Sequence, residues 1–290
     1  MMRWNSQSKL RFDQLVTTIV VTYPTQSGLL MQRLKKVILS VMSNSVENQS
    51  TSDTWRRYDA IEQRLSAPLT NRMLQLGELR PGLTVLDVAT GRGEPAIPAA
   101  KKVLPGGRVL GVDIDPSVLQ IAKEKREIEN VTNLELVASD LEVLQGIPNH
   151  SFDVVLARWC LMYVKNPQTA LKRLREVLTR DGKLVAAIWV NPEEASFYQL
   201  PRLALSSVTA ATVDNYNVPS TFYYSNEDRL EKDLSASDFK IVHSESIEIS
   251  VMELSSEEEL ISWGLSFGGR AMLQQLSKQK KTSGKKTFSC

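Results

Sequence analysis

The residues with the clearest chemical potential follow an apolar segment at residues 83–88. Asp87 stands near the end of this segment, and Gly91 and Gly93 follow it within the sequence VLDVATGRGE of residues 85–94. Glycines adopt backbone conformations that other residues resist, so the chain can approach a ligand closely there. The carboxylate of Asp87 can accept hydrogen bonds from an ammonium group. Glycines between a strand and a helix also occur as plain turns, so this segment alone does not establish a ligand site.

Two further carboxylates follow the next two apolar segments of the chain. Asp113 comes twenty residues after the second glycine, and an acid at that distance can accept both hydroxyl groups of a ribose. Asp140 follows the third apolar segment and can accept from the exocyclic amine of adenine. Each acid alone could be a helix N-cap, as we expect for Asp115. Three acids that end three successive strands favour a site for an adenosine-containing ligand.

Alternating apolar runs and helical patterns position these residues. This alternation predicts a series of βαβ units around a parallel sheet, which is an α/β fold. We expect strands over residues 83–88, 108–112, 134–138, 152–157 and 183–190, the last preceded by a turn at 181–182. Helices are expected over residues 55–76, 95–104, 116–128 and 167–178. A further strand is expected over residues 240–251, with helices over 195–213 and 257–276.

The ordered motifs resemble one family. They are VLDVATGRGE, VLGVDID, VASDLE, FDVVLARWCLMYV and LKRLREVLTRDGKLVAAIW. In this order they resemble class I S-adenosylmethionine-dependent methyltransferases, and within them the type-11-like group that includes the ubiquinone/menaquinone-biosynthesis C-methyltransferases. The resemblance covers about residues 55–276. It implies a Rossmann-like, doubly wound, mostly parallel sheet with an N-terminal helical cap.

The resemblance also implies a cofactor and the residues that bind it. The cofactor would be S-adenosyl-L-methionine, and the expected cofactor-binding residues are Asp87, Ala89, Gly91, Gly93, Asp113, Ile114, Asp140, Leu141 and Ala157. The residues around the glycines would line the methionine part, the acid of the second strand would hold the ribose, and those of the third would contact the adenine. Tyr58 and Arg158 would contact the substrate, which we expect to be a small methyl acceptor.

The main alternative ligand is a nicotinamide dinucleotide. The spacing of Gly91, Gly93 and Ala96 fits a permissive form of the dinucleotide-binding motif. Asp87, however, would place a carboxylate close to a pyrophosphate, and like charges repel. A zwitterionic methionine tail suits this acid better, so the sequence favours S-adenosylmethionine.

The aromatic residues give a weaker indication of the acceptor. Several follow the fifth strand, namely Phe197, Tyr198, Tyr216, Phe222, Tyr223 and Tyr224. They favour an aromatic or apolar small-molecule acceptor, although ordinary packing explains them equally well. The aromatic stripe of the helix at 55–76, which includes Trp55 and Tyr58, could likewise be either a pocket wall or core.

No catalytic side chain is expected, because the sulfonium methyl is already activated and the enzyme needs mainly to position the acceptor. A base is required only if the acceptor must lose a proton. His150 and His243 are the only histidines, and the chain has no CxxC or HExxH motif, so no metal site is expected. A cofactor-binding protein of this fold that transfers no methyl group is the alternative function.

Composition limits the partners and the compartment. The net charge is +2 and the basic residues are scattered, so no nucleic-acid partner is expected. The segment Ala157-Arg158-Trp159-Cys160 also lacks an NPPY-like tetrad of nucleic-acid methyltransferases. Cys160 and Cys290 lie far apart, which favours a reducing, cytoplasmic compartment. The sequence predicts no transmembrane segment and leaves the oligomeric state open.

Both ends differ from the middle of the chain. Residues 1–54 form an expected N-terminal extension, and residues 1–45 carry six basic residues against one acid. This extension could be an organelle-targeting segment, a family-specific addition, or a stretch upstream of a true start at Met42. Its apolar run at 15–23 is too short to span a bilayer, and the pattern from Leu30 to Val41 suggests a short amphipathic helix.

The methyltransferase domain is expected over residues 55–277, followed by a basic, disordered tail at 278–290. Domains that resemble this one finish with two antiparallel strands. The segment 240–251 supplies one, but nothing after Leu276 has the pattern of an apolar strand. The C-terminal end is therefore expected to be truncated or divergent, or to have the tail in place of the strand.

Overall fold

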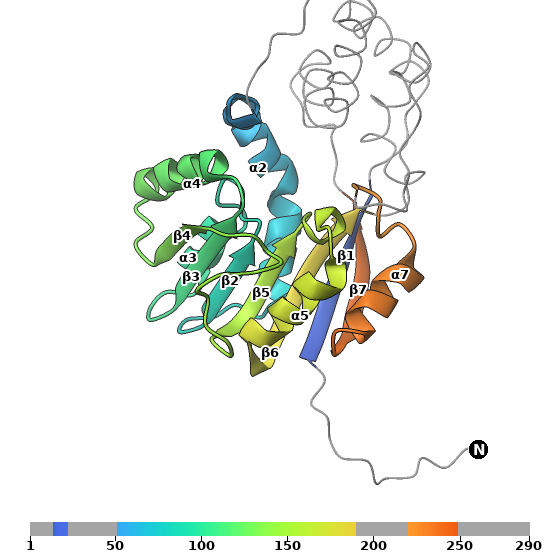
Figure 1. Ribbon diagram of the computed structural model, residues 1–290. Coiled ribbons are helices and arrows are strands. Elements are labelled where there is room, and N and C mark those ends of the chain that lie inside the picture. The colour runs from blue at the N-terminus through green and yellow to red at the C-terminus, as the bar shows by residue number, and fades with distance from the viewer. Residues whose placement is uncertain (1–13, 23–50, 190–219, 249–290) are drawn as a thin grey trace, which may run out of the picture.

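The computed structural model describes residues 14–22, 51–189 and 220–248 (Figure 1). The helices expected over 195–213 and 257–276, the amphipathic pattern from Leu30 to Val41 and the basic tail lie outside the described residues.

A seven-stranded sheet forms the centre of the described part, with the strand order β4-β3-β2-β5-β6-β1-β7. The strands are β1 (Gln14–Thr22), β2 (Thr84–Val88), β3 (Arg108–Asp113), β4 (Leu134–Ala138), β5 (Phe152–Arg158), β6 (Leu178–Trp189) and β7 (Phe239–Glu248). All six strand pairings are parallel. The chain runs outward from β2 to β4 and then returns to place β5 beside β2. The carboxyl ends of β2 and β5 therefore form the switch point at which ligands bind in open α/β sheets.

The helices are α2 (Thr51–Leu76), α3 (Ala96–Lys102), α4 (Pro116–Ile128), α5 (Pro167–Val177) and α7 (Glu227–Ser235), with a short 3-10 turn at Leu161–Tyr163. α2 contacts α4, whereas α5 contacts α7. In Figure 1, α5 lies in front of the sheet and the lower part of α2 lies behind it. The Rossmann-like, doubly wound α/β fold with an N-terminal helix is thus confirmed.

Two boundaries differ from the sequence expectation by four residues or more. α2 begins at Thr51 rather than Trp55, because the polar first turn of a helix has no apolar periodicity to mark it. β6 begins at Leu178, so residues 181–182 belong to the strand rather than to a turn before it. The register with β5 changes from Phe152–Leu178 to Val154–Lys183. Residues 179–182 lie in this irregular stretch of the strand, which explains why residues 181–182 have the sequence of a turn.

The apolar run near the N-terminus is strand β1, and it lies between β6 and β7, parallel to both. Its pairing with β6 runs from Leu15–Lys183 to Val21–Trp189. Its pairing with β7 runs from Gln14–Phe239 to Thr22–Glu248. β1, from the N-terminal part of the chain, is therefore the neighbour of β7. The two strands are parallel, so the antiparallel pairing expected for segment 240–251 was wrong.

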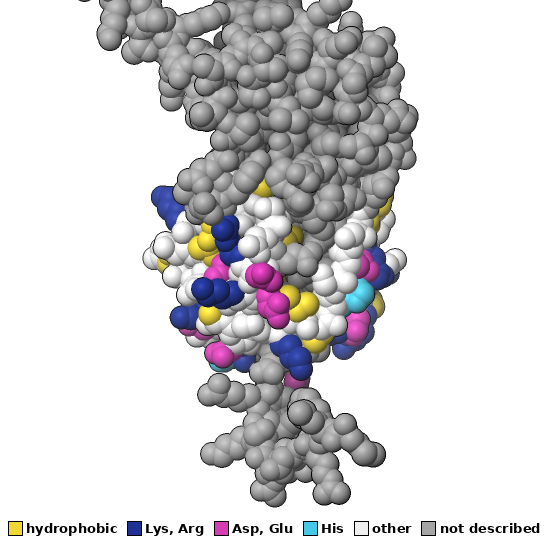
Figure 2. Space-filling model, turned by 90° about the vertical axis from the view of Figure 1, so that its right-hand side faces the viewer, with side chains coloured by type: hydrophobic (Ala, Val, Ile, Leu, Met, Phe, Trp, Pro, Cys, Tyr) yellow, Lys and Arg dark blue, Asp and Glu magenta, His cyan; other side chains and the backbone are white. Residues whose placement is uncertain are grey.

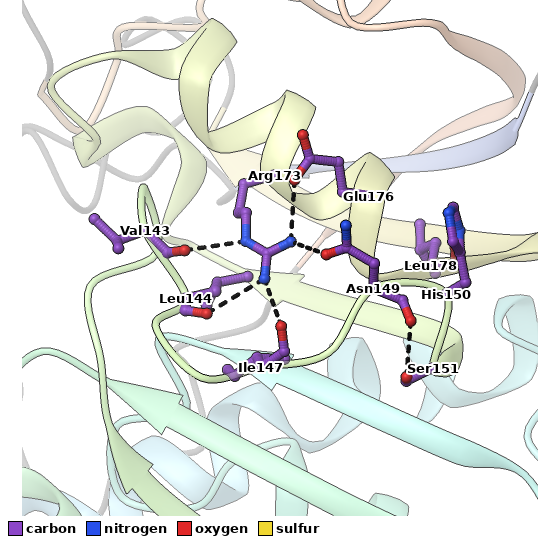
Figure 3. Close-up of polar contacts among 9 residues, drawn as sticks. All are labelled: Val143, Leu144, Ile147, Asn149, His150, Ser151, Arg173, Glu176 and Leu178. Atoms are coloured by element: carbon purple, nitrogen blue, oxygen red, sulfur yellow. Dashed lines mark hydrogen bonds and ion pairs between the residues drawn. The ribbon is translucent and has the colours of Figure 1, made fainter.

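The loop between β4 and β5 is held by one arginine of α5 (Figure 3). Arg173 donates to the carbonyl oxygens of Val143, Leu144 and Ile147 at 3.0, 3.3 and 2.6 Å, and to the side-chain oxygen of Asn149 at 2.6 Å. The Leu144 carbonyl also accepts from the backbone N–H of Ile147 at 3.1 Å, so the carbonyls of Val143 and Ile147 depend most on Arg173. This brace fixes the path by which the chain returns to β5.

Candidate functional site

The loop from β2 to α3 has an unusual backbone. Ala89, Gly91 and Gly93 have φ angles of 52°, 55° and 86°, in the left-handed region. A Cβ atom on Gly93 would lie 2.8 Å from Cδ1 of Ile97, so only glycine fits there without displacement. Ala89 adopts a conformation that is unfavourable for a residue with a side chain, and such strain is often found at functional sites.

Asp87 is completely buried beneath this loop. Its Oδ2 accepts a hydrogen bond from the Thr90 hydroxyl at 2.6 Å, whereas Oδ1 is buried without a partner among the described residues. Burial raises the pKa of Asp87 to about 7, although the hydrogen bond from Thr90 lowers it. A buried carboxylate oxygen without a donor is costly, and a cationic ligand group would satisfy it.

Asp113 joins the end of β3 to the glycine loop. Its Oδ2 accepts from the backbone N–H of Gly91 and its Oδ1 from that of Asp115, both at 2.9 Å. Burial raises the pKa of Asp113, and these backbone hydrogen bonds oppose the rise. Each carboxylate oxygen keeps a second lone pair that can accept from a ligand hydroxyl. Asp115 caps α4, as the sequence predicted.

Ile114 follows directly and is 69% exposed, which makes it a large apolar side chain presented at the end of a strand. An isolated exposed side chain of this kind needs no explanation by itself. Its position directly after Asp113 makes it suitable for contact with a flat ligand ring.

The end of β4 lies beside that of β3, because the backbone N–H of Ser139 donates to the carbonyl of Asp113 at 2.9 Å. Asp140 is exposed and accepts from the backbone N–H of Glu142 at 2.8 Å, whereas Leu141 is buried. The Ser139 hydroxyl is buried and has no hydrogen-bond partner among the described residues. Sequence reasoning missed Ser139, although its place directly before Asp140 could have indicated it.

The end of β5 completes the switch point. Ala157 is buried and pairs with Val88 of β2, so Arg158 lies level with the start of the glycine loop. Arg158 donates to the Thr70 hydroxyl of α2 at 3.3 Å. Burial lowers the pKa of its guanidinium, and the nearby Glu94 opposes this effect. The buried carboxylate of Asp87 and the guanidinium of Arg158 therefore lie at the same edge of the sheet.

α2 is attached to the glycine loop by charged contacts that sequence reasoning missed. Arg92 is 5% exposed and forms an ion pair with Asp59 of α2. The guanidinium of Arg92 also lies 4.6 Å from the ring centroid of Trp55, and Lys125 of α4 lies 3.1 Å from Asp59. The arginine between the two glycines is unusual and could have indicated this contact from the sequence.

Tyr58 is 4% exposed and packs within the hydrophobic core cluster, with the guanidinium of Arg57 5.5 Å from its ring centroid. Its role as a substrate contact stays a prediction. Phe222 and Tyr224 are fully buried, so these two aromatics serve packing.

Cys160 is buried, and burial raises the pKa of its thiol, which disfavours the reactive thiolate. No cluster of three potential metal ligands occurs among the residues that the structure describes. In the same part of the chain, no helix is both long and apolar enough to cross a membrane.

Comparison with known proteins gives related sequences. Residues 79–212 match the family model described as a methyltransferase domain. The chain is 31% identical over 127 residues to aklanonic acid methyltransferase DauC of Streptomyces sp. (strain C5), covering 44% of this chain and 57% of that protein. It is 32% identical over 155 residues to nocamycin O-methyltransferase of Saccharothrix syringae, covering 53% and 55%.

A third relative is ubiquinone/menaquinone biosynthesis C-methyltransferase UbiE of Salmonella arizonae. The chain is 29% identical to it over 174 residues, which cover 57% of this chain and 69% of that protein. The matched part spans little more than half the length of the first two relatives.

Proposed function

We propose that this chain is a class I S-adenosylmethionine-dependent methyltransferase related to UbiE and that it transfers a methyl group to a small molecule. The match of residues 79–212 to a methyltransferase domain and the similarity to UbiE support this proposal. S-adenosylmethionine is the cofactor of this family. We place it across the carboxyl ends of β4, β3, β2 and β5.

The unpartnered oxygen of Asp87 is the observation that supports this assignment most strongly. A buried carboxylate with one free oxygen suits the methionine ammonium and would repel the pyrophosphate of a dinucleotide. The remaining lone pairs of Asp113 would accept the ribose hydroxyls, and Ile114 would pack on the adenine. Ser139 would join Asp140 and Leu141 at the adenine edge.

The bound cofactor supplies a methyl group already activated by its sulfonium, so the side chains have mainly to position it and exclude water. The glycine loop, held to Asp113 and covered by α2 through Arg92 and Asp59, fixes the methionine side of the site. Arg158 at the end of β5 would face the acceptor and favour an acceptor group with negative charge.

The acceptor is proposed to be a small, aromatic or apolar metabolite. The names of the relatives, which refer to aklanonic acid, nocamycin, ubiquinone and menaquinone, support a small-molecule acceptor. We further propose that the methyltransferase domain comprises residues 55–277 together with β1. The two separated cysteines favour a cytoplasmic location.

Calorimetric titration with S-adenosylmethionine tests the cofactor site. The wild type is expected to bind saturably, and Asp113→Ala to lose at least tenfold in affinity, about 1.4 kcal/mol. Asp153→Asn is the matched control, because Asp153 accepts from the backbone N–H of Thr84 at the opposite, amino end of the strands. Unchanged affinity in Asp113→Ala, or equal losses in both variants, would contradict the site assignment.

Transfer itself is tested with methyl-labelled S-adenosylmethionine and a panel of quinones, phenols and amines. Label transferred to any acceptor, and its loss in Asp113→Ala, would support the enzymatic function. Saturable cofactor binding without transfer to any member of the panel would favour a binding protein that does not methylate.

A further inference from the structure

Trp159 is the first residue after β5, and its conformation is unusual. Its φ angle is 55°, in the left-handed region that bulky residues rarely adopt. The backbone is held there by the N–H of Trp159, which donates to the carbonyl of Ala187 in β6 at 2.9 Å. Such a conformation persists only where the surrounding structure enforces it.

The ring of Trp159 is also fixed. It stacks on Trp189, the last residue of β6, with 4.8 Å between ring centroids and 13° between planes. The guanidinium carbon of Arg158 lies 4.9 Å from the same ring centroid. These contacts leave the indole little freedom to rotate, so its N–H keeps one direction.

That N–H is a donor without an acceptor. The Nε1 atom of Trp159 is buried, and no hydrogen-bond partner for it occurs within the described part of the chain. A buried tryptophan N–H usually finds a partner, and an unpaired donor costs free energy. An unsatisfied donor on an immobilised ring suggests a ligand atom as its partner.

The strand order places this donor on the acceptor side of the site. Under the proposed binding mode, the adenine lies over β3 and β4 and the methionine part over β2. The next strands in the sheet are β5 and β6, which end at Arg158 and Trp189. Trp159 directly follows β5, so it lies on the side of the methionine part that is away from the adenine.

We propose that the indole N–H of Trp159 donates a hydrogen bond to an oxygen atom of the methyl acceptor. The acceptor is then an oxygen-bearing molecule such as a phenol, enol or hydroquinone. The adjacent guanidinium of Arg158 favours an oxygen that carries negative charge. This inference rests on the proposed function and deepens it by naming a substrate class and a residue that selects it.

The test compares probe pairs of similar shape, in which one member carries the oxygen. The pairs are 2-naphthol with 2-methylnaphthalene and 1,4-naphthoquinone with naphthalene, titrated by equilibrium binding in the presence of S-adenosylhomocysteine. In the wild type, at least one oxygen-bearing probe is expected to bind about three- to tenfold more tightly than the apolar member of its pair. This is the difference in affinity that one hydrogen bond typically produces.

Trp159→Phe is expected to abolish this preference. Trp189→Phe retains the Trp159 N–H and is the matched control, which should keep the preference. The preference is the ratio of two affinities measured on the same variant. A general loss of pocket structure weakens the binding of both probes and therefore does not produce a selective loss of the preference. Trp159→Leu also removes the indole N–H and introduces no other hydrogen-bond donor, and it replaces Trp159→Phe if that variant unfolds.

Absence of any oxygen preference in the wild type, or its persistence without the indole, would overturn the inference. Failure of the wild type to bind S-adenosylhomocysteine would instead contradict the proposed function. The two failures are therefore distinguishable.

Discussion

The backbone N–H of Gly91 donates to Oδ2 of Asp113 over 2.9 Å, so the acid that ends β3 holds the loop that follows β2. The same carboxylate accepts from the backbone N–H of Asp115 through its other oxygen. The side chain of Asp113 thus fixes the conformation of the site in the absence of ligand. Preorganisation of this kind lowers the entropic cost of binding.

This dual role predicts that Asp113 contributes to stability as well as to cofactor binding. Asp113→Ala removes both backbone hydrogen bonds and should lower the free energy of unfolding by about 2 kcal/mol. Asp113→Asn keeps one acceptor oxygen and should lose about half as much. Urea denaturation measures both variants. Equal stability of Asp113→Ala and the wild type would show that the loop does not depend on this contact.

The raised pKa of Asp87 predicts a pH dependence of cofactor binding. An ammonium group favours the ionised carboxylate, so affinity for S-adenosylmethionine should increase as the pH rises through about 7. Binding near pH 6 should release a proton, which calorimetry in buffers of different ionisation enthalpy detects. Asp87→Asn should bind weakly with no such dependence. A flat profile in the wild type would mean that Asp87 does not meet the ammonium.

The same shift affects the unliganded protein in the opposite sense. Because the folded-state pKa of Asp87 is raised from 3.8 to about 7, ionisation destabilises the fold. The penalty is absent below pH 3.8, grows between those two values and is complete above about 7. Asp87→Asn should therefore gain stability relative to the wild type between pH 5 and 8 in urea denaturation. A constant difference across this range would refute the coupling.

The contact between α2 and the glycine loop predicts unequal effects of two ion pairs. Asp59→Ala leaves Arg92 nearly buried without its carboxylate and should destabilise the protein by about 3 kcal/mol. Arg56→Ala is the control, because Arg56 pairs with Glu124 on the exposed surface and should cost less than about 1 kcal/mol. Thermal unfolding compares the two. A similar small effect in both would mean that Asp59 does not secure α2.

The brace around Arg173 predicts a local effect on the loop between β4 and β5 (Figure 3). Arg173→Met should destabilise the protein by about 2 kcal/mol, because the carbonyls of Val143 and Ile147 and the side-chain oxygen of Asn149 lose this donor together. Lys172→Met on the exposed face of the same helix should change little. Hydrogen exchange should increase at residues 143–151 only in the first variant. Unaltered exchange there would contradict the brace.

Strand β1 predicts that the N-terminal segment is needed for the sheet. Removal of residues 1–22 should uncover the edges of β6 and β7, lower the melting temperature and promote aggregation. Removal of residues 1–13 leaves β1 in place and is the control. A chain that begins at Met42 should behave like the longer deletion. Equal stability of both deletions would show that β1 contributes nothing.

The sheet and the acids at its carboxyl edge could be predicted from sequence because they depend on local patterns. Apolar runs mark the strands, and Asp87, Asp113 and Asp140 lie at or just beyond their carboxyl ends. The position of β1 could not be predicted, because the local sequence of an apolar run does not determine which distant strands it pairs with. The contacts of Arg92 and the unpaired N–H of Trp159 also depend on side chains brought together only by folding.

A crystal structure of the complex with S-adenosylhomocysteine tests the central claim most directly. The account predicts the ligand ammonium at Oδ1 of Asp87 and the ribose hydroxyls within hydrogen-bond distance of Asp113, with the adenine over Ile114. A ligand bound elsewhere, or one whose ribose and ammonium contact neither carboxylate, would contradict it.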